Sequence, residues 1–584
     1  MPYPSSAQIR KLASELMDAA TKRWVQETLG DPNNIYGISF PATTAEARSH
    51  ARAMASLQST HVHVTSDGVY YTDGREHGLS CGYEIRYTPT DHLSVFWPRD
   101  STAWKSIREG YAYVKVSADA LADMHPSKFS HSISEMAKVV TGLDQGGLKA
   151  SSEDITTVVD KSVDGKGDLS KIFGPESTWH EMSGVSQDLS HWEGYAAQSF
   201  KLAVSDRLPL ILLGQLAVAE TLQESLELAQ KAMEGAKTDV AALLQHNIDA
   251  LEAEMRGADV DWSSTLQTIS NVCDVAALGA AVIPTPETEA GAVGIKTVGY
   301  FLSKLAKKAS KVDSAKNLGM MAYKHFESKG GSHEKLQIAH GSVDTRMSKC
   351  SSELDRIKST YTGIEDGLRD ILQRFLDILH SKSIGARLHV DAAKNSTVNL
   401  TMRQAFFELK APADGHAATL TDLGKRYGDH DRGNDPTHSS LTDVSSFADP
   451  EVHGKDLGIE LYGMHNAATR DLPAIAAKYG GLASGLGAAG GGVESAFTRS
   501  DVAVVDQPGA AASGPHKVPG TGNLYPTWLA LHDELGTIFK HCDTNLKLAG
   551  VALAAIAKDF AEHDSAAASA IRGLCEKHNE KQWV

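Results

Sequence analysis

The chain has 584 residues, of which 41% are hydrophobic and 22% are charged, and its formal net charge is −16. This length accommodates about two to four domains, and the balance of apolar and charged residues excludes disorder along the whole chain. The acidic balance argues against nucleic acid as the main partner, because binding to phosphate backbones needs a concentrated basic surface.

The 5 cysteines are scattered and form no C-x-x-C pair, so neither a disulfide framework nor a cysteine-rich zinc site is expected. The first residues contain no apolar core of a signal peptide. No uninterrupted apolar run reaches the roughly 18 residues that a membrane helix needs. We therefore expect a soluble chain that is cytoplasmic before any export. If it is exported, it leaves the cell by a route other than the Sec pathway.

The N-terminal part mixes two kinds of pattern. Residues 5–28 and 42–58 carry apolar side chains at helical spacing. Between about 60 and 97, short β-branched and aromatic runs alternate with D-G turns, which predicts three or four antiparallel strands. Helical patterns return over 101–141. We therefore predict a small α+β domain over residues 1–150, whose role the sequence does not indicate.

Long helical patterns follow, the first over residues 206–256. The second alternates spacings of four and three without a break. Its apolar positions are Val343, Met347, Cys350, Leu354, Ile357, Tyr361, Ile364, Leu368, Ile371, Phe375 and Ile378. A seam this narrow must be covered by other helices. The fold class predicted is therefore mainly α, with antiparallel long-helix hairpins or coiled-coil packing in a helical bundle.

The remaining domain boundaries follow from composition. We predict a long-helix hairpin unit over residues 151–395, with a small-residue apolar insert at 274–308 that we interpret as a buried hairpin rather than a membrane-inserting one. A polar connecting region is predicted over 396–457. A C-terminal helical hairpin over 458–584 is predicted to contain a flexible Gly/Pro-rich loop at 480–523.

The stretch SHWEGYAAQSF, residues 190–200, interrupts two helical segments. Gly194 permits a tight turn, Trp192 fits the crevice between two antiparallel helices, and the alanines that follow permit close approach. With this motif the chain resembles a long member of the WxG-motif helical-hairpin family, whose proteins are exported by type VII secretion systems of actinobacteria and related bacteria. The resemblance implies a hairpin turn that binds a partner hairpin, or a second copy of the chain, and secretion to the medium or cell surface.

The family also carries an export signal of the form Y-x-x-x-[D/E], read by the type VII export machinery. Three pairs are candidates for it. They are Tyr361 with Glu365, Tyr427 with Asp431, and Phe560 with Asp564. The third pair has phenylalanine in place of tyrosine. Tyr361 and Phe560 also lie on apolar helical stripes, where core packing is the simpler interpretation.

Catalytic patterns are sparse, and we expect no catalytic residue, cofactor or metal. His61 and His63 would share one face of a strand and are weak candidates for a metal site, since a third ligand at diagnostic spacing is missing. The leading hypothesis is a non-enzymatic type VII secretion-associated protein, a substrate or a structural or chaperone-like partner. The alternatives are an exported toxin or hydrolase with a histidine site in residues 1–150, and a membrane-active effector acting through residues 274–308.

Overall fold

The computed structural model describes the chain in separate stretches. They are residues 3–29, 61–64, 69–72, 84–87, 94–96, 113–143, 182, 184–185, 188–189, 200, 204–205, 207–256, 339, 341–381, 384–391, 396–409, 463–497 and 524–563. Over these stretches the protein is mainly α-helical, as the sequence predicts.

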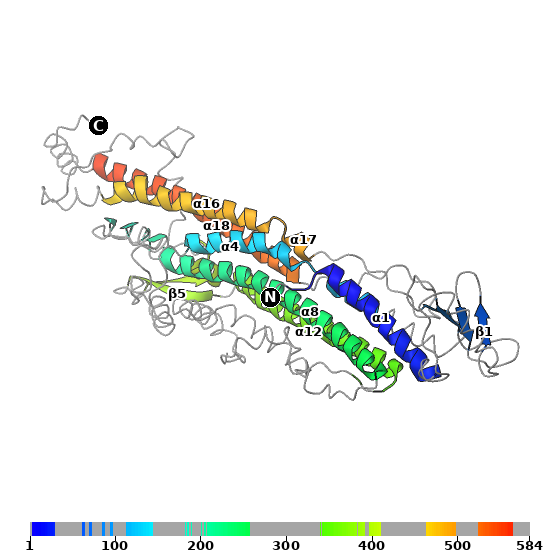
Figure 1. Ribbon diagram of the computed structural model, residues 1–584. Helices are drawn as coiled ribbons and strands as arrows, with labels where there is room; N and C mark the ends of the chain where they lie inside the picture. Colours follow the sequence, from blue (N-terminus) through cyan, green and yellow to red (C-terminus); the bar gives the residue numbers. More distant parts are fainter. Residues whose placement is uncertain are drawn as a thin grey trace, which may run out of the picture.

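Three long helices form an elongated bundle (Figure 1). They are α8 (Leu208–Met255), α12 (Val343–His380) and α18 (Leu524–His563), of 48, 38 and 40 residues. At 1.5 Å per residue α8 is about 72 Å long. It packs against α12 along one side, and α12 in turn contacts α18.

The apolar seam predicted for α12 is confirmed. All of its predicted positions from Val343 to Phe375 are buried, and Ile378 is partly buried against the same core. The helix begins at a serine cap, since the Ser342 side chain accepts a hydrogen bond from the backbone N–H of Thr345. The periodicity therefore identified both the bounds and the buried face of this helix.

Two N-terminal helices join the same core. Helix α1 (Ser6–Leu29) lies along the C-terminal half of α8, and α4 (Phe129–Leu143) packs against α8 and α16 (Leu472–Gly490). A helical segment at 113–122 and the 3₁₀ turn η1 (Pro126–Lys128) precede α4. The expectation of a small separate α+β domain over residues 1–150 is not supported, because these helices bury their apolar faces in one core with the long helices.

Four short strands lie between α1 and the segment at 113–122. They are β1 (His61–Val64), β2 (Val69–Thr72), β3 (Glu84–Tyr87) and β4 (Ser94–Phe96). They pair antiparallel in chain order. Each connection therefore joins neighbouring strands, as in a meander.

The start of the predicted connecting region 396–457 belongs to the core. Strands β5 (Ile384–Asp391) and β6 (Ser396–Thr401) form a hairpin that leads into the short helix α13 (Met402–Phe406). Gly214 on α8 makes room for this turn, because a Cβ at this position would lie 1.8 Å from the carbonyl oxygen of Phe406. The expectation of a polar connector is therefore wrong for the described residues 396–409.

The C-terminal part forms a helical hairpin in which α16 packs against α18. A π-helical turn, η7 (Ala467–Asp471), precedes α16, and α17 (Val493–Phe497) follows it. The predicted flexible loop at 480–523 is wrong over its first part, which is helical to Gly490 and again in α17. None of the helices in the described stretches has an apolar segment long enough to cross a membrane.

Candidate interaction surface

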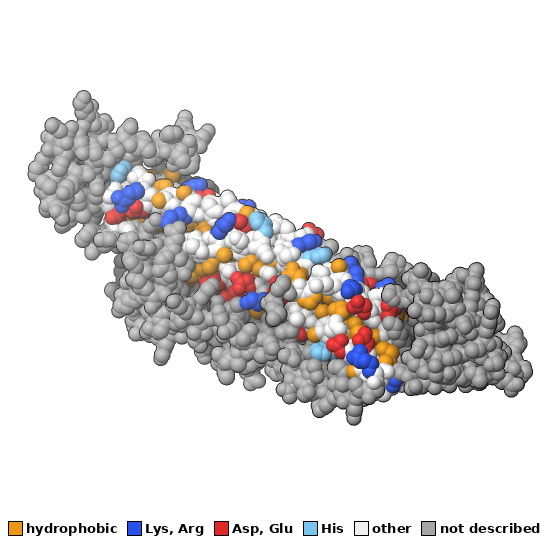
Figure 2. Space-filling view, in the orientation of Figure 1, with side chains coloured by type: hydrophobic (Ala, Val, Ile, Leu, Met, Phe, Trp, Pro, Cys, Tyr) orange, Lys and Arg blue, Asp and Glu red, His pale blue; other side chains and the backbone are white. Residues whose placement is uncertain are grey.

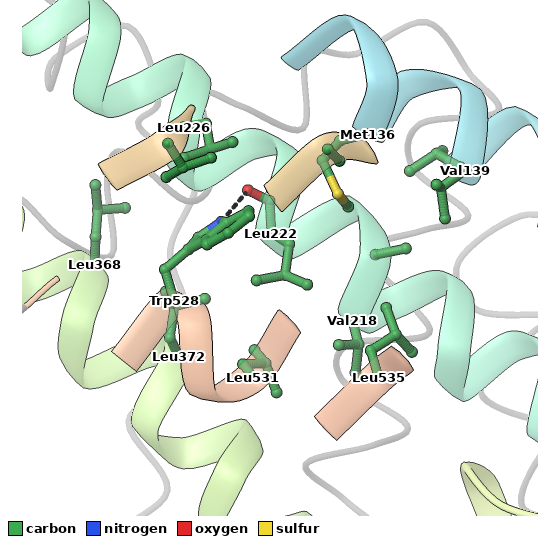
Figure 3. Close-up of a cluster of buried hydrophobic side chains, with 14 of the residues drawn as sticks. Met136, Val139, Val218, Leu222, Leu226, Leu368, Leu372, Trp528, Leu531 and Leu535 are labelled. Atoms are coloured by element: carbon green, nitrogen blue, oxygen red, sulfur yellow. Dashed lines mark hydrogen bonds between the residues drawn. The ribbon is translucent and has the colours of Figure 1, made fainter. Parts of the chain in front are cut away.

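Trp528 fixes the α16–α18 hairpin to the long helix α8. Its side chain is fully buried, and its indole N–H donates to the carbonyl oxygen of Leu222, 3.1 Å away (Figure 3). The ring stacks on His532 at 5.0 Å between centroids, and Nε2 of His532 lies 2.8 Å from the carbonyl oxygen of Leu486 on α16. One chain of contacts therefore links α8, α18 and α16, so α16 is held with one face inward.

The outer face of α16 is exposed and uncharged over its whole length. Its exposed residues, including the turn that follows the helix, are Pro473, Ala474, Ala477, Gly481, Ser484, Gly487, Ala488, Gly491 and Gly492. Lys478 is the single charged residue between Leu472 and Gly492, and it is half-buried. Such a face lets another backbone approach closely and carries no charge that must be desolvated.

The rest of the visible surface differs from this face. Figure 2 shows basic and acidic side chains interspersed with hydrophobic ones over the described part of the molecule. Mixed charges of this kind are usual for solvated helix surfaces. The uncharged face of α16 is therefore suited to packing against a further helix.

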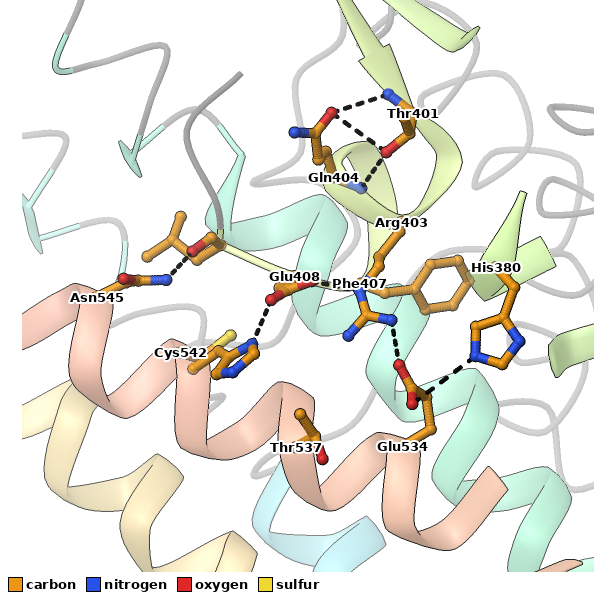
Figure 4. Close-up of polar contacts among 12 residues, drawn as sticks. His380, Thr401, Arg403, Gln404, Phe407, Glu408, Glu534, Thr537, Cys542 and Asn545 are labelled. Atoms are coloured by element: carbon orange, nitrogen blue, oxygen red, sulfur yellow. Dashed lines mark hydrogen bonds and ion pairs between the residues drawn. The ribbon is translucent and has the colours of Figure 1, made fainter. Parts of the chain in front are cut away.

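A polar junction holds α13 against α18 and the end of α12 (Figure 4). Arg403 donates hydrogen bonds to the carboxylates of Glu408 and Glu534. The Nδ1 atom of His541 contacts the other oxygen of Glu408, and Nε2 of His380 lies 3.8 Å from Glu534. Burial alone would raise the pKa of Glu408, but the hydrogen bonds from Arg403 and His541 outweigh it and hold the pKa below its usual value.

Arg207, the residue that precedes α8, supports the same junction. Its guanidinium is fully buried and donates to the carbonyl oxygens of Gln404 and Glu408, at 2.9 Å for the latter. Burial lowers the pKa of Arg207 to about 10, so the side chain stays charged at neutral pH. Because carbonyl groups at the end of a helix lack partners within it, a buried arginine at this place stabilises the end of α13.

The groups at this junction do not form a nucleophilic site. Burial raises the pKa of Cys542, which lies beside it, to about 11, and that of Cys350 on α12 to about 12. Thiols with such pKa values carry almost no thiolate at neutral pH. In the part of the chain that the structure describes, no group of three metal-ligating side chains gathers. The junction therefore has the chemistry of a structural tie.

One of the predicted signal pairs lies in the core. Tyr361 and Glu365 are 0% and 1% exposed, and the tyrosine hydroxyl donates to the glutamate carboxylate one turn later. Core packing, the simpler interpretation, agrees with this position. A receptor has no access to the pair while the bundle is folded.

The other predicted site residues fall mainly outside the described stretches. This holds for Trp192, Gly194, Tyr427 and Asp431. The residues on either side of the W-x-G motif that the structure does describe, Leu189 and Phe200, are both fully buried.

The remaining candidates are described only in backbone. Phe560 belongs to the last turns of α18, but its side chain and Asp564 lie outside the described part. His61 and His63 lie two positions apart on strand β1, opposite Thr72 and Tyr70 of β2. Their side chains also lie outside the described part.

The junction around Arg403 is not predicted by the sequence patterns. A local signal was present, since Thr401 and Gln404 have the spacing of a capping box and form one, each side chain bonding the other's backbone N–H. This signal predicts the start of α13. It does not predict that Arg403 contacts α18, whose Glu534 lies more than 120 positions later in the chain.

Comparison of the chain with family models, with curated proteins and with solved structures found no match.

Proposed function

We propose that this protein is a type VII secretion-associated helical protein that acts by protein–protein recognition. It would be an exported substrate or a structural or chaperone-like partner. The observation that carries the proposal is the exposed, uncharged outer face of α16, from Ala474 to Gly491, on a hairpin anchored to the bundle by Trp528. The W-x-G motif at Trp192 and Gly194 supports the choice of family.

Recognition would take place by helix-on-helix packing. The partner is a helical hairpin of another protein or a second copy of this chain, which lays an apolar stripe along the small residues of α16. An exported member of the family would also bind the export machinery through one of its aromatic–acid pairs. The product would then act outside the cell, at the surface or in the medium.

Charged substitutions on the outer face of α16 can show whether this face binds a partner, separately from any effect on the stability of the fold. Ala477→Glu with Ala488→Glu places two carboxylates on the outer face, where a partner helix would have to desolvate them. Thr537→Glu with Thr544→Glu places the same charges on exposed positions of α18 and serves as the control. The α16 variant should lose secretion, or self-association in sedimentation, with an unchanged melting temperature. Equal behaviour of both variants would exclude α16 as the recognition face.

The export signal is tested by secretion in an actinobacterial host with an active type VII system. Phe560→Ala with Asp564→Ala and Tyr427→Ala with Asp431→Ala are compared with wild type after circular dichroism has shown unchanged helicity. Loss of export in one folded variant identifies the signal. A wild-type chain that never leaves the host, or leaves it equally well without the type VII system, would refute the secretion part of the proposal.

A further inference from the structure

Two carboxyl groups meet where the short segment around Asp188, described at residues 182, 184, 185, 188 and 189, contacts the start of the C-terminal hairpin. Asp188 and the η7 residue Asp471 lie within hydrogen-bonding reach of one another, although they are 283 positions apart in the chain. Their side chains are only 25% and 13% exposed. Two carboxylates this close repel one another, so such a pair favours holding a proton.

The backbone keeps the pair together. Gly463 packs directly on the carbonyl oxygen of Asp188, because a Cβ at this position would lie 1.9 Å from that oxygen. Met182, Val185 and Leu189 are fully buried, so the segment is docked by apolar contact. The packing of the backbone and of these apolar side chains therefore holds the two aspartates close to one another.

Arg470 is the cation that both carboxyl groups share. Its Nη2 lies 3.3 Å from Oδ2 of Asp188, and its Nε lies 2.7 Å from Oδ1 of Asp471. Its side chain is 64% exposed, so solvent screens its attraction. Burial, the hydrogen bond to Asp471 and the negative charge of Asp471 together raise the pKa of Asp188 to about 6. The positive charge of Arg470 acts in the opposite direction and lowers this pKa.

We propose that Asp188 and Asp471 form a proton-sharing clamp that holds the described residues around Asp188 (182, 184, 185, 188 and 189) against the start of α16 more tightly in mildly acidic than in neutral solution. The sign follows from the direction of the shift. A carboxyl whose pKa is raised on docking stabilises the docked state below its undocked pKa and loses that contribution as the pH rises through its docked value.

Among the described residues, the other titratable groups near the pair do not produce this effect. His465, six residues before Asp471, has a pKa lowered by burial, so its protonation at low pH would destabilise the fold there. Helix α18 meets η7 through Gly550, which packs on the carbonyl oxygen of Ala468. The nearest charged residue of α16 itself, Lys478, follows Asp471 by about two turns.

Hydrogen exchange of the full-length protein tests the clamp. The peptide covering residues 182–189 is followed at about pH 7.5 and about pH 5, and its exchange is divided by the rate of the unfolded peptide at the same pH. Protection in wild type should rise roughly three- to tenfold on acidification. A peptide from α4 should not follow this rise.

Substitutions at Asp188 and Asp471 test whether these two residues cause the rise in protection at acid pH. Asp188→Asn and Asp471→Asn should each abolish the rise, whereas Asp377→Asn, on an exposed part of α12, should leave it intact. Arg470→Met should move the pH midpoint of the rise in hydrogen-exchange protection to higher pH, because the variant removes a charge that lowers the pKa of Asp188. This variant tests the clamp even if an asparagine variant fails to dock. Wild-type protection that is independent of pH, or a rise that persists in both asparagine variants, would overturn the proposal.

Discussion

Two tyrosine–carboxylate pairs show how burial changes the energy of one kind of contact. Tyr361 and Glu365 are bonded inside the core. Tyr113 donates to Asp355 at 2.7 Å on the surface, with the tyrosine 47% exposed. Water competes for the second pair and not for the first, so only the buried hydroxyl is difficult to replace.

Removal of the buried hydroxyl should therefore destabilise the fold. We expect Tyr361→Phe to lower the free energy of unfolding by about 1–3 kcal/mol, because a buried carboxylate loses a donor. Tyr113→Phe is the control and should change it by less than about 0.5 kcal/mol. Urea denaturation measures both. If Tyr361→Phe instead blocked secretion at unchanged stability, the pair would be a signal rather than a core contact.

Glu408 should make stability depend on pH in the acid range. Its pKa is held below the usual value, so its contribution is present above the unfolded-state pKa and disappears as the pH falls through the folded value. We expect Glu408→Gln to cost about 2–4 kcal/mol at about pH 7 and progressively less below about pH 4. Glu252→Gln, at a half-exposed position of α8, is the control. A cost for Glu408→Gln that stays constant down to about pH 2 would contradict this assignment.

At the level of helices, glycines have opposite roles in α8 and α16. Gly214 is required, since an added methyl group would overlap the carbonyl oxygen of Phe406. Gly481 lies on the outer face of α16, where an added methyl group would contact nothing within 4 Å. Glycine costs about 1 kcal/mol relative to alanine inside a helix unless space requires it.

The same substitution should therefore change stability in opposite directions. Gly481→Ala is expected to stabilise the protein by up to about 1 kcal/mol. Gly214→Ala should destabilise it by more than about 3 kcal/mol, because a backbone carbonyl must move. Thermal and urea unfolding of the two variants check this, and each is the control of the other. Equal effects would mean that α13 does not pack on α8 as described.

The sequence predicted elements where a single local pattern decides them. The α12 seam has one apolar residue at nearly every third or fourth position, and its bounds follow from that period. In α16, glycine-rich composition predicted a loop from residue 480. The helix continues because Leu486 and Ala489 are buried against neighbouring helices, and this packing outweighs the cost of the glycines.

The polar junction could not be predicted for a different reason. Its charges come from α12, α13 and α18, from Arg207 just before α8 and from Glu408 just after α13, which are separated by more than a hundred positions in places. No spacing in the chain relates Arg403 to Glu534 before the fold is known. The capping box at Thr401 predicts a helix start there, but not what the helix contacts.

At the level of the whole molecule, the first helix is part of the common core. The ammonium group of Lys237 on α8 donates to the carbonyl oxygens of Ala122 and Met124 and lies 3.3 Å from the Ser6 hydroxyl of α1. Further along, Arg23 lies 3.7 Å from Glu254. The N-terminal helix therefore covers the second half of α8.

Deletion of residues 1–29 should for this reason damage the entire fold. It exposes the face of α8 that Ile9, Leu16 and Ala20 cover, and we expect a melting temperature lower by about 5 °C or more. Lys11→Ala, at an exposed position of α1, is the control. If the truncated chain melted like the full-length protein, residues 1–29 would belong to an independent unit after all.

The reactivity of the buried thiols of α12 and α18 can report how fast the bundle opens. Cys350 and Cys542 are 2% and 0% exposed, so a thiol reagent reaches them only when the helices separate. At high reagent concentration the labelling rate equals the opening rate of the bundle at each position. In an oxidising environment, these two thiols would thus be protected from cross-linking for as long as the helices around them stay packed.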